Sequence, residues 1–99
     1  MDYAIEHVAR ALRRAREGKG LSQRALSTAS GVPQGHISKI EAGTVDLRLS
    51  SLIELARALD LELMLVPRHA VTAARMIIRV SESDLSARPA YSLDEDDDG

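Results

Sequence analysis

The amino-terminal part of the chain alternates apolar and polar residues with the period of an α-helix. Apolar residues recur at spacings of three and four, so a first helix is predicted to bury one face. Glycines at positions 18 and 20 follow this pattern, and we expect the helix to end there. The residues of its apolar face are Ile5, Val8, Leu12 and Ala15.

A second, shorter helix is predicted to begin near Gln23. Ser22 is a good N-cap, and Leu21 can contact Leu26 across the first turn as a hydrophobic staple. Gly31 suits the left-handed conformation of a residue just past a helix end. We therefore expect this helix to end directly before Gly31.

A third helical pattern begins two residues after Gly31. Ile37 and Ile40 share one side of it, polar residues occupy the other sides, and Gly43 closes it. Two short helices joined by a tight turn that contains glycine form the helix-turn-helix layout.

A fourth helix is predicted after a polar loop. Ser51 and Glu54 offer a capping box at its start, and an apolar stripe suits a helix that closes the core. The four patterns together predict a compact all-α domain of four to five helices, which with the segment that follows them makes up residues 1–67. The apolar stripe of the fourth helix consists of Leu52, Leu55, Ala56 and Leu59.

The period changes after the fourth helix. Residues 61–66 alternate like a short β-strand, and Pro67 ends the pattern. Because a lone strand leaves its backbone groups unpaired, we expect it to pair with the same strand of a second copy. Two alternatives stay open, in which the segment continues the fourth helix or lies on the surface as an apolar strap. The residues expected at the dimer contact are Leu61, Leu63, Met64, Leu65 and Val66.

Residues 68–80 form a short extension for which two structures stay open. Val71, Ala74 and Ile78 suit one face of a helix, whereas the run from residue 76 to residue 80 also suits a strand. The pattern does not decide between them.

Residues 81–99 are expected to form a disordered acidic tail. They contain too little apolar surface to offset the entropy lost on ordering. Three roles stay open for this tail. The first is a solubilising end, and the second is a segment that orders on a toxin or other partner through Tyr91 and Leu93. The third is an acidic arm that competes with DNA for a basic face.

The charge of the chain is distributed unevenly, which bears on its partners. The net charge is −2, but residues 1–68 contain ten Lys and Arg against eight Asp and Glu, whereas residues 69–99 contain three against seven. A basic amino-terminal part favours a polyanionic partner. The acidic isoelectric point near 5.9 favours a competing class, a protein-interaction module that keeps the fold without binding DNA.

Several classes of function lack the residues that they need. The chain has no cysteine, its three histidines are far apart, and it has no glycine-rich phosphate loop. We therefore expect no enzyme activity, no metal and no other cofactor. Aromatic residues make up only 2% of the chain, which disfavours single-strand binding by base stacking. No apolar run is long enough for a membrane span and no signal peptide is recognisable, so we expect a cytoplasmic protein.

The outward residues near the start of the third helix are small or can hydrogen-bond to base edges. Gln34 can pair with adenine, Ser38 can donate or accept, and Lys39 can reach guanine or phosphate. Gly35 lets the backbone come close, and the second helix can hold a phosphate at its start. The alternative is that these are ordinary exposed residues of two helices. The candidate DNA-binding set is Gln23, Arg24, Gln34, Gly35, His36, Ser38 and Lys39.

The run from residue 21 to residue 43, followed by residues 52–59, resembles the Cro/C1-type (Xre) helix-turn-helix family, which includes the phage lambda repressor. The resemblance implies a lambda-repressor-like fold that binds double-stranded DNA. It implies that Gln23 contacts a phosphate and that Arg16 and Glu41 form a structural ion pair, so we assign Glu41 to the fold. By this resemblance, the residues that face base edges are Gln34, Gly35, Ser38 and Lys39. The residues in register with the family are Gln23, Gly31, Gln34, Ile37, Ile40, Glu41 and Gly43.

The sequence departs from this family at two positions. Pro33 stands where a Ser or Thr N-cap is usual, which removes a side-chain cap typically worth about 1 kcal/mol. Gly35 gives up a side chain that would contact bases. We therefore expect Gln34 and Lys39 to make most of the direct contacts with DNA bases.

The segment from Leu61 to Leu65 indicates a particular group within this family. It is similar to the HipB-type antitoxins, in which such a strand pairs with its twin across the dimer axis. This implies a homodimer that represses its own operon at an inverted-repeat operator and binds a HipA-like kinase toxin. It would act in the cytoplasm, at the nucleoid when bound to its operator. The competing interpretation is a stand-alone repressor with a different dimer contact.

Overall fold

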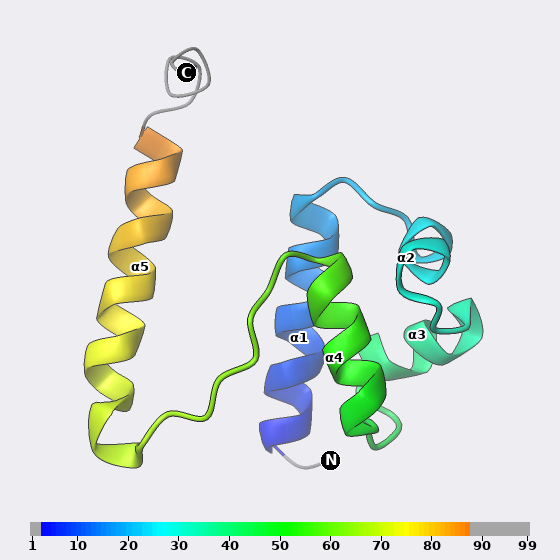
Figure 1. Ribbon diagram of the computed structural model, residues 1–99, viewed down its shortest axis with the longest axis horizontal. Coiled ribbons are helices and arrows are strands. Elements are labelled where there is room, and N and C mark those ends of the chain that lie inside the picture. The colour runs from blue at the N-terminus through cyan, green and yellow to red at the C-terminus, as the bar shows by residue number, and fades with distance from the viewer. Residues whose placement is uncertain (1–2, 88–99) are drawn as a thin grey trace. The chain divides into compact units, whose positions relative to one another are not determined.

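The structure is a computed structural model that describes residues 3–87, with side chains described for residues 4–82. The regular elements in this range are all helical, which confirms the all-α class, and four of the α-helices lie within residues 1–67. The elements are α1 (Tyr3–Gly18), α2 (Gln23–Ser30), α3 (Gln34–Glu41), α4 (Leu49–Ala58), the 3-10 helix η1 (Arg68–Ala70) and α5 (Val71–Ala87) (Figure 1). None of the described helices is long and apolar enough to span a bilayer.

Helix α2 begins and ends as its local sequence predicts. The hydroxyl of Ser22 accepts a hydrogen bond from the backbone N–H of Ala25 at 2.9 Å, which satisfies one of the free donors of the first turn. Gly31 adopts a left-handed conformation with φ of 81° and donates its N–H to the Ser27 carbonyl. The turn that leads into α3 is therefore fixed at the glycine.

Helix α3 begins directly after Pro33, which makes no side-chain capping bond, as expected. The Pro33 carbonyl accepts from the N–H groups of His36 and Ile37, so the backbone alone starts the first turn. At the other end Gly43 has φ of 71°, and Thr44 donates its N–H to the Lys39 carbonyl.

The expected start of α4 is wrong. The capping-box prediction places Ser51 before the helix, but α4 begins at Leu49 and Arg48 is the residue with extended N-cap geometry. Ser51 therefore lies inside the first turn, where its backbone is helical and cannot cap. The helix thus begins three residues earlier than expected, shortly after Leu47, which is partly buried against the core.

One hydrophobic core holds the first four helices together. Helix α2 contacts both α3 and α4, and α3 contacts α1. Leu26, Ile37 and Leu55 are the most completely buried large side chains, and burying each of them stabilises the fold by about 1.5–3 kcal/mol. The buried cluster consists of Leu12, Leu26, Val32, Ile37, Ile40, Leu55 and Leu59.

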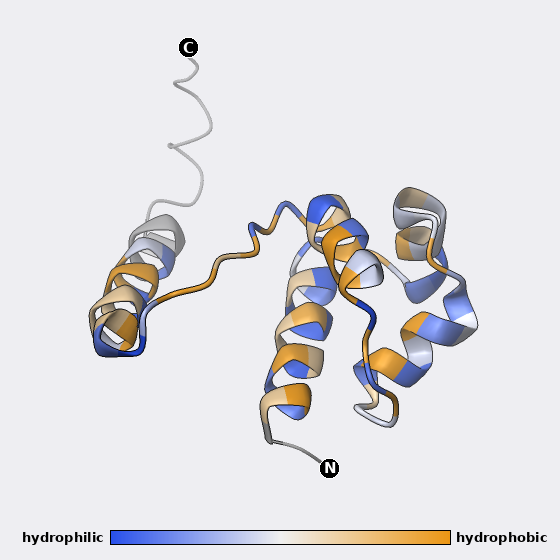
Figure 2. Cartoon of the chain, turned by 60° about the horizontal axis from the view of Figure 1, so that its bottom comes forward, coloured by the Kyte–Doolittle hydropathy of each residue, from blue (hydrophilic) through white to orange (hydrophobic). Residues whose placement is uncertain are grey.

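Residues 61–67, which we call the strap, are neither helix nor strand in the described chain. Helix α4 ends before them, because Asp60 turns the backbone with φ of 57° and Leu61 donates its N–H to the Ala56 carbonyl. The continued-helix alternative is therefore wrong. A single chain offers the strap no partner strand, so its pairing across a dimer stays a prediction. Figure 2 shows that the strap is largely hydrophobic.

The extension left undecided by the sequence is helical. Its first residues include Ala73, Ala74, Arg75 and Met76, all strong helix formers. Helix α5 continues past residue 80, where we expected the tail to begin, and ends at Ala87. Tyr91, Leu93 and the acidic run at 94–98 lie outside the described residues. The described chain divides into two compact units, one that ends at Leu63 and one that begins at Met64.

Candidate nucleic-acid interface

Helix α3 presents a polar outer side because two isoleucines fix its rotation. Ile37 and Ile40 are 1% and 2% exposed, so the side of α3 that contains them faces the core. With 3.6 residues per turn, three other positions fall together on the opposite side, and Gln34, which lies about one turn before Ile37, falls at its edge. The exposed residues on and beside this outer side are Gln34, Gly35, Ser38 and Lys39.

Gly35 is not required by the fold. A Cβ atom built at this position would have no other atom within 4 Å, and its φ is not positive. Glycine inside a helix lowers stability by roughly 0.5–1 kcal/mol relative to alanine. The bare backbone here therefore costs stability without a structural reason, as expected of a surface that something approaches closely.

The ion pair implied between Arg16 and Glu41 is present and joins three elements. Arg16 Nε donates to Glu41 Oε2 at 2.7 Å, and its Nη2 donates to Oε1 at 3.0 Å. Its Nη1 donates to the Leu21 carbonyl at 2.7 Å, directly before α2. The two side chains are 12% and 4% exposed. This bidentate geometry compensates the cost of burying both charges.

Glu41 also determines the pKa of its partner. The hydrogen bond from Arg16 to Glu41 raises the pKa of Arg16 above its ordinary value, although burial acts in the opposite direction. A raised pKa in the folded state stabilises the fold at every pH below the ordinary pKa of arginine. The arginine side of the pair is therefore charged throughout the physiological range.

A line of hydrogen bonds leads from this ion pair to the outer side of α3. Gln23 Nε2 donates to Glu41 Oε1 at 3.1 Å, and Gln34 Nε2 donates to Gln23 Oε1 at 3.0 Å. Gln23 is half-buried, whereas Gln34 is exposed. Gln34 keeps an amide N–H and its carbonyl oxygen for another partner. Its carboxamide is thus held in one orientation at the start of α3.

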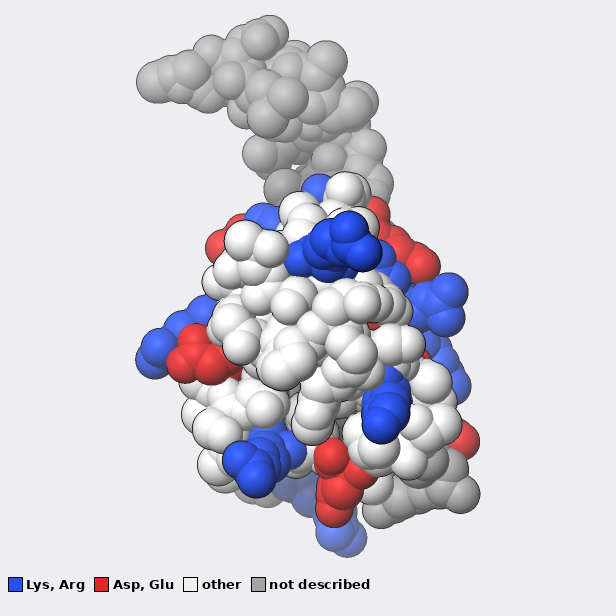
Figure 3. All heavy atoms as spheres, turned by 90° about the vertical axis from the view of Figure 1, so that its right-hand side faces the viewer, with Lys and Arg blue, Asp and Glu red and all other residues white. Residues whose placement is uncertain are grey.

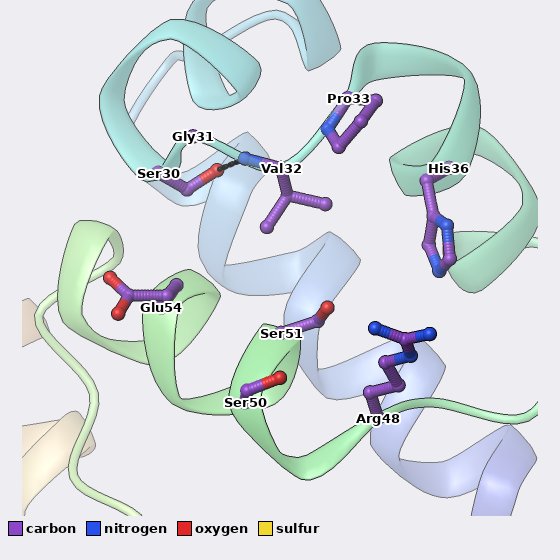
Figure 4. Close-up of a pocket in the computed structure, with 9 residues that line it drawn as sticks. All are labelled: Ser30, Gly31, Val32, Pro33, His36, Arg48, Ser50, Ser51 and Glu54. Atoms are coloured by element: carbon purple, nitrogen blue, oxygen red, sulfur yellow. Dashed lines mark hydrogen bonds between the residues drawn. The ribbon is translucent and has the colours of Figure 1, made fainter.

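His36 lies apart from the outward set. It is half-buried, and its Nε2 atom is buried without a hydrogen-bond partner among the described residues. Figure 4 shows its ring directed toward the start of α4, near Arg48 and Ser51. The structure therefore groups His36 with a neighbouring hollow and separates it from Gln34 and Lys39.

This hollow lies between the α2–α3 turn and the first turn of α4 (Figure 4). Arg48 is exposed at its edge and forms no ion pair within residues 4–82. The amino terminus of α4 has no side-chain cap, and such helix ends attract anions. The residues that line the hollow are Ser30, Gly31, Val32, Pro33, His36, Arg48, Ser50, Ser51 and Glu54.

Arg48 is a candidate that sequence reasoning missed. It stands directly before a helix, and an arginine at a helix amino terminus is a recognisable signal for phosphate contact. Because the capping-box prediction placed the start of α4 after Ser51, Arg48 was not recognised as the residue directly before a helix. Arg24, exposed in the first turn of α2, is the corresponding cation that the sequence did single out.

The surface around α2 and α3 suits a polyanion in its charge as well. Figure 3 shows this side of the molecule as a mainly uncharged surface, with Lys and Arg side chains around its edge and fewer Asp and Glu. In the part of the chain that the structure describes, no group of three His, Asp or Glu residues could hold a metal ion.

Known proteins share this architecture. Residues 12–65 match the family model described as helix-turn-helix. Over 78 residues the chain is 50% identical to the uncharacterized HTH-type transcriptional regulator y4dL of Sinorhizobium fredii. That match covers 79% of this chain and 40% of the relative, so the chain spans less than half of its length.

A solved structure agrees with the fold. The restriction-modification controller protein C.AhdI from Aeromonas hydrophila is 33% identical and superposes with a TM-score of 0.59. The superposition covers 62% of this chain and 92% of the controller protein. With more than half of the chain matched, and α2 and α3 arranged as described above, the chain belongs to the Cro/C1-type (Xre) helix-turn-helix family of DNA-binding transcriptional regulators.

Proposed function

We propose that this protein is a homodimeric repressor that reads an inverted-repeat operator with two copies of α3. The observation that carries the proposal is the fixed carboxamide of Gln34, exposed at the start of α3 and anchored through Gln23 to Glu41. A side chain held before binding loses less conformational entropy when it meets a base. Gln34 is therefore the residue to which we assign the main base contact, with adenine as its preferred partner.

The remaining candidates divide into base-reading and phosphate-binding residues. Ser38 and Lys39 share the outer side of α3 with Gln34, and we assign them to base edges. We assign Arg24 and Arg48 to the phosphates on either side of the groove. His36 faces the hollow beside Arg48, so we exclude it from direct base reading.

The dimer is the second part of the proposal. Two α3 helices read successive turns of one DNA face when their centres lie about 34–36 Å apart. We propose that the straps of two copies pair as antiparallel strands, through Leu61, Leu63, Met64, Leu65 and Val66. The support is that no backbone hydrogen bond joins residues 62–66 to the rest of the described chain.

The biological setting has two candidates. The strap sequence supports an antitoxin that represses its own operon in the cytoplasm and binds a HipA-like kinase toxin. The names of the two relatives describe a transcriptional regulator and a controller protein, which supports a stand-alone regulator equally well. A gene for a kinase-like toxin next to the gene for this protein, with co-purification of the two products, distinguishes the antitoxin.

The proposal is tested by selecting binding sites from a random pool of double-stranded DNA with the purified full-length protein. We expect an inverted repeat whose half-sites are one helical turn apart, and a footprint on such a repeat upstream of the gene itself. Failure to enrich any sequence at low salt would refute the proposal and favour the protein-interaction module.

A further inference from the structure

We propose that the hollow between the α2–α3 turn and α4 binds a phosphoryl oxyanion between His36 and Arg48, and that binding brings a proton onto His36. The group belongs to a DNA backbone or to a small phosphorylated compound, because both present the same oxygens. The inference deepens the proposed function and rests on it only for DNA as the source. Occupation of the hollow is then stronger at lower pH.

His36 has a polar atom for which the fold supplies no partner. Its Nε2 atom is buried and forms no hydrogen bond within the described residues. Buried polar groups are nearly always hydrogen-bonded, so an unpaired one marks a place for a partner from outside the chain. Figure 4 shows the ring directed into the hollow, toward Arg48 and Ser51. His36 therefore offers a ring nitrogen to a molecule that enters there.

The α4 side of the hollow supplies the other donors that an oxyanion needs. The guanidinium of Arg48 and the hydroxyls of Ser50 and Ser51 form no hydrogen bond or ion pair within residues 4–82. The first backbone N–H groups of α4 have no side-chain cap. A guanidinium and free N–H groups at a helix start are the donors that commonly bind phosphoryl oxygens.

The charges that face His36 leave a negative charge without opposition. Arg48 and the amino end of α4 contribute positive charge. Glu54 is the one carboxylate among the described lining residues, and it forms an ion pair with Arg57 at 4.0 Å. The lining residues of the α2–α3 turn, 30–33, are uncharged. An anion between the imidazole and the guanidinium therefore favours the protonated ring, in which both nitrogens are donors.

The hollow has room for this group. Its volume is about 450 Å³, whereas a water molecule takes up roughly 30 Å³ in the liquid, and a phosphoryl group replaces only a few waters. The side chain of Arg48, toward which the ring points, is exposed. Exposed side chains change rotamer within nanoseconds, so Arg48 can move to give an oxygen access to Nε2.

The first experiment measures the binding of sulfate to the full-length protein. Sulfate is the probe because it stays doubly charged at each pH used, so a change of its affinity with pH comes from the protein. We expect saturable binding that is about tenfold tighter at about pH 6 than at about pH 8, because histidine changes its charge in this range. The ring signals of His36 in NMR spectra report both binding and protonation.

Three variants test the residues that we assign to the hollow. His36→Gln keeps a polar side chain that does not titrate, and it should lose the pH dependence of sulfate binding. His69→Gln is the matched control, because His69 is exposed and lies outside the hollow, and it should keep that dependence. Arg48→Gln, at an exposed position, should weaken sulfate binding about tenfold or more at both pH values. Circular dichroism checks that the variants fold.

Two results would overturn the inference. Sulfate affinity that is equal in the wild-type protein, His36→Gln and Arg48→Gln would identify an adventitious ion only. A wild-type affinity that is the same at the two pH values would show that no proton is taken up.

Operator binding at constant ionic strength identifies the source of the phosphoryl group. If the group belongs to DNA, the wild-type protein should bind the selected operator about tenfold more tightly at about pH 6 than at about pH 8, and His36→Gln should not. If it belongs to a small compound, both proteins should show the same pH dependence on the operator, although only the wild type shows it for sulfate.

The outcomes also separate this inference from the proposed function. A protein that selects no DNA, but binds sulfate with a pH dependence that His36→Gln removes, supports the site and refutes the regulator. A protein that selects an operator, but whose sulfate affinity does not depend on His36 or Arg48, refutes the site and leaves the regulator intact.

Discussion

At the scale of single residues, the interface separates a charged group that holds the fold from neutral groups that can read bases. Glu41 accepts hydrogen bonds from both Arg16 and Gln23, so its charge is compensated inside the protein. Gln34 at the end of this line is neutral, oriented and exposed. Glutamine loses less hydration than a charged residue when it enters a groove, and it offers a donor and an acceptor.

Substitutions of Gln34 and of Arg48 are expected to weaken DNA binding in different ways. Gln34→Ala should weaken binding to the selected operator by about 1–3 kcal/mol and change binding to random DNA little, because it removes a base contact. Arg48→Ala should weaken both equally and reduce the slope of log affinity against log salt by about one, because it removes a phosphate contact. Fluorescence anisotropy at several salt concentrations measures both. Equal losses for Gln34→Ala on the two DNAs would remove it from base reading.

Removing Glu41 is expected to destabilise the first unit severely. Glu41→Ala leaves the guanidinium of Arg16 buried without its partner, at a cost of about 3–5 kcal/mol in the free energy of unfolding. Glu54→Ala is the matched control, because the Arg57–Glu54 pair is exposed, does not include Arg16 and is worth at most about 0.5 kcal/mol. Urea unfolding compares the two variants. A similar small loss for both would show that the pair contributes nothing to the fold.

The pH dependence of stability should not come from Arg16. Its pKa is raised in the folded state, so its contribution is fully present below the ordinary pKa of arginine and is lost only above it. Any loss of stability between about pH 6 and pH 9 must therefore arise from other groups. Urea unfolding of the wild-type protein and of the double variant Arg16→Met/Glu41→Gln, which leaves no buried charge unpaired, tests the point across this range. A difference between them that changes steeply within it would contradict the assignment.

At the scale of elements, α3 starts without a side-chain cap, and its second residue is a glycine, which has no side chain. Pro33 cannot cap, but a proline with compatible geometry stabilises a fold by about 0.4–1 kcal/mol through the unfolded chain. This is comparable to the roughly 1 kcal/mol that a Ser or Thr cap contributes. The loss of the usual cap therefore costs α3 little, and Gly35 is its larger weakness.

Gly35→Ala is expected to raise stability and reduce DNA binding. It should increase the free energy of unfolding by about 0.5–1 kcal/mol, because the added methyl group meets no atom and glycine is a poor helix former. It should weaken operator binding if the backbone lies against DNA. Gly18→Ala, also in open space but at the end of α1, is the control for binding. An operator affinity unchanged by Gly35→Ala would show that DNA does not approach this position.

At the scale of the whole molecule, the two units differ in how much of their apolar surface is buried. The buried cluster runs from Leu12 to Leu59, entirely within the first unit. The second unit has no buried residue in its described part, and Met76, Ile77 and Val80 of α5 are exposed there. In our proposal the first unit binds DNA, and the strap sets the distance between the two copies of α3.

A chain that ends at residue 63 is expected to fold but to bind as a monomer. It keeps the entire buried cluster, so thermal unfolding should stay cooperative. On the full operator it should lose the gain in affinity that comes from linking two half-sites, which is commonly 100-fold or more. Sedimentation and anisotropy measure the two effects. A truncated protein that remains a tight dimer would refute the strap contact.

The sequence by itself determined the features that depend on neighbouring residues. Ser22, Gly31 and Gly43 fix helix ends through hydrogen bonds and conformations only a few residues long, and the isoleucines of α3 fix its outward side. The start of α4 was missed because this helix begins at Leu49 without a side-chain cap, so the local capping signal at Ser51 does not mark it.

Only the tertiary structure decided how the interface is assembled. The bond from Gln34 to Gln23 spans 11 residues of sequence, so no local pattern contains it. The bond from Arg16 to Glu41 spans 25 residues, and it was expected from the family resemblance rather than from a local pattern. The hollow that joins His36 and Arg48 likewise exists only after α3 and α4 pack together. Local sequence selects helices because their hydrogen bonds are local, whereas the orientation of a reading side chain depends on contacts that the core alone brings together.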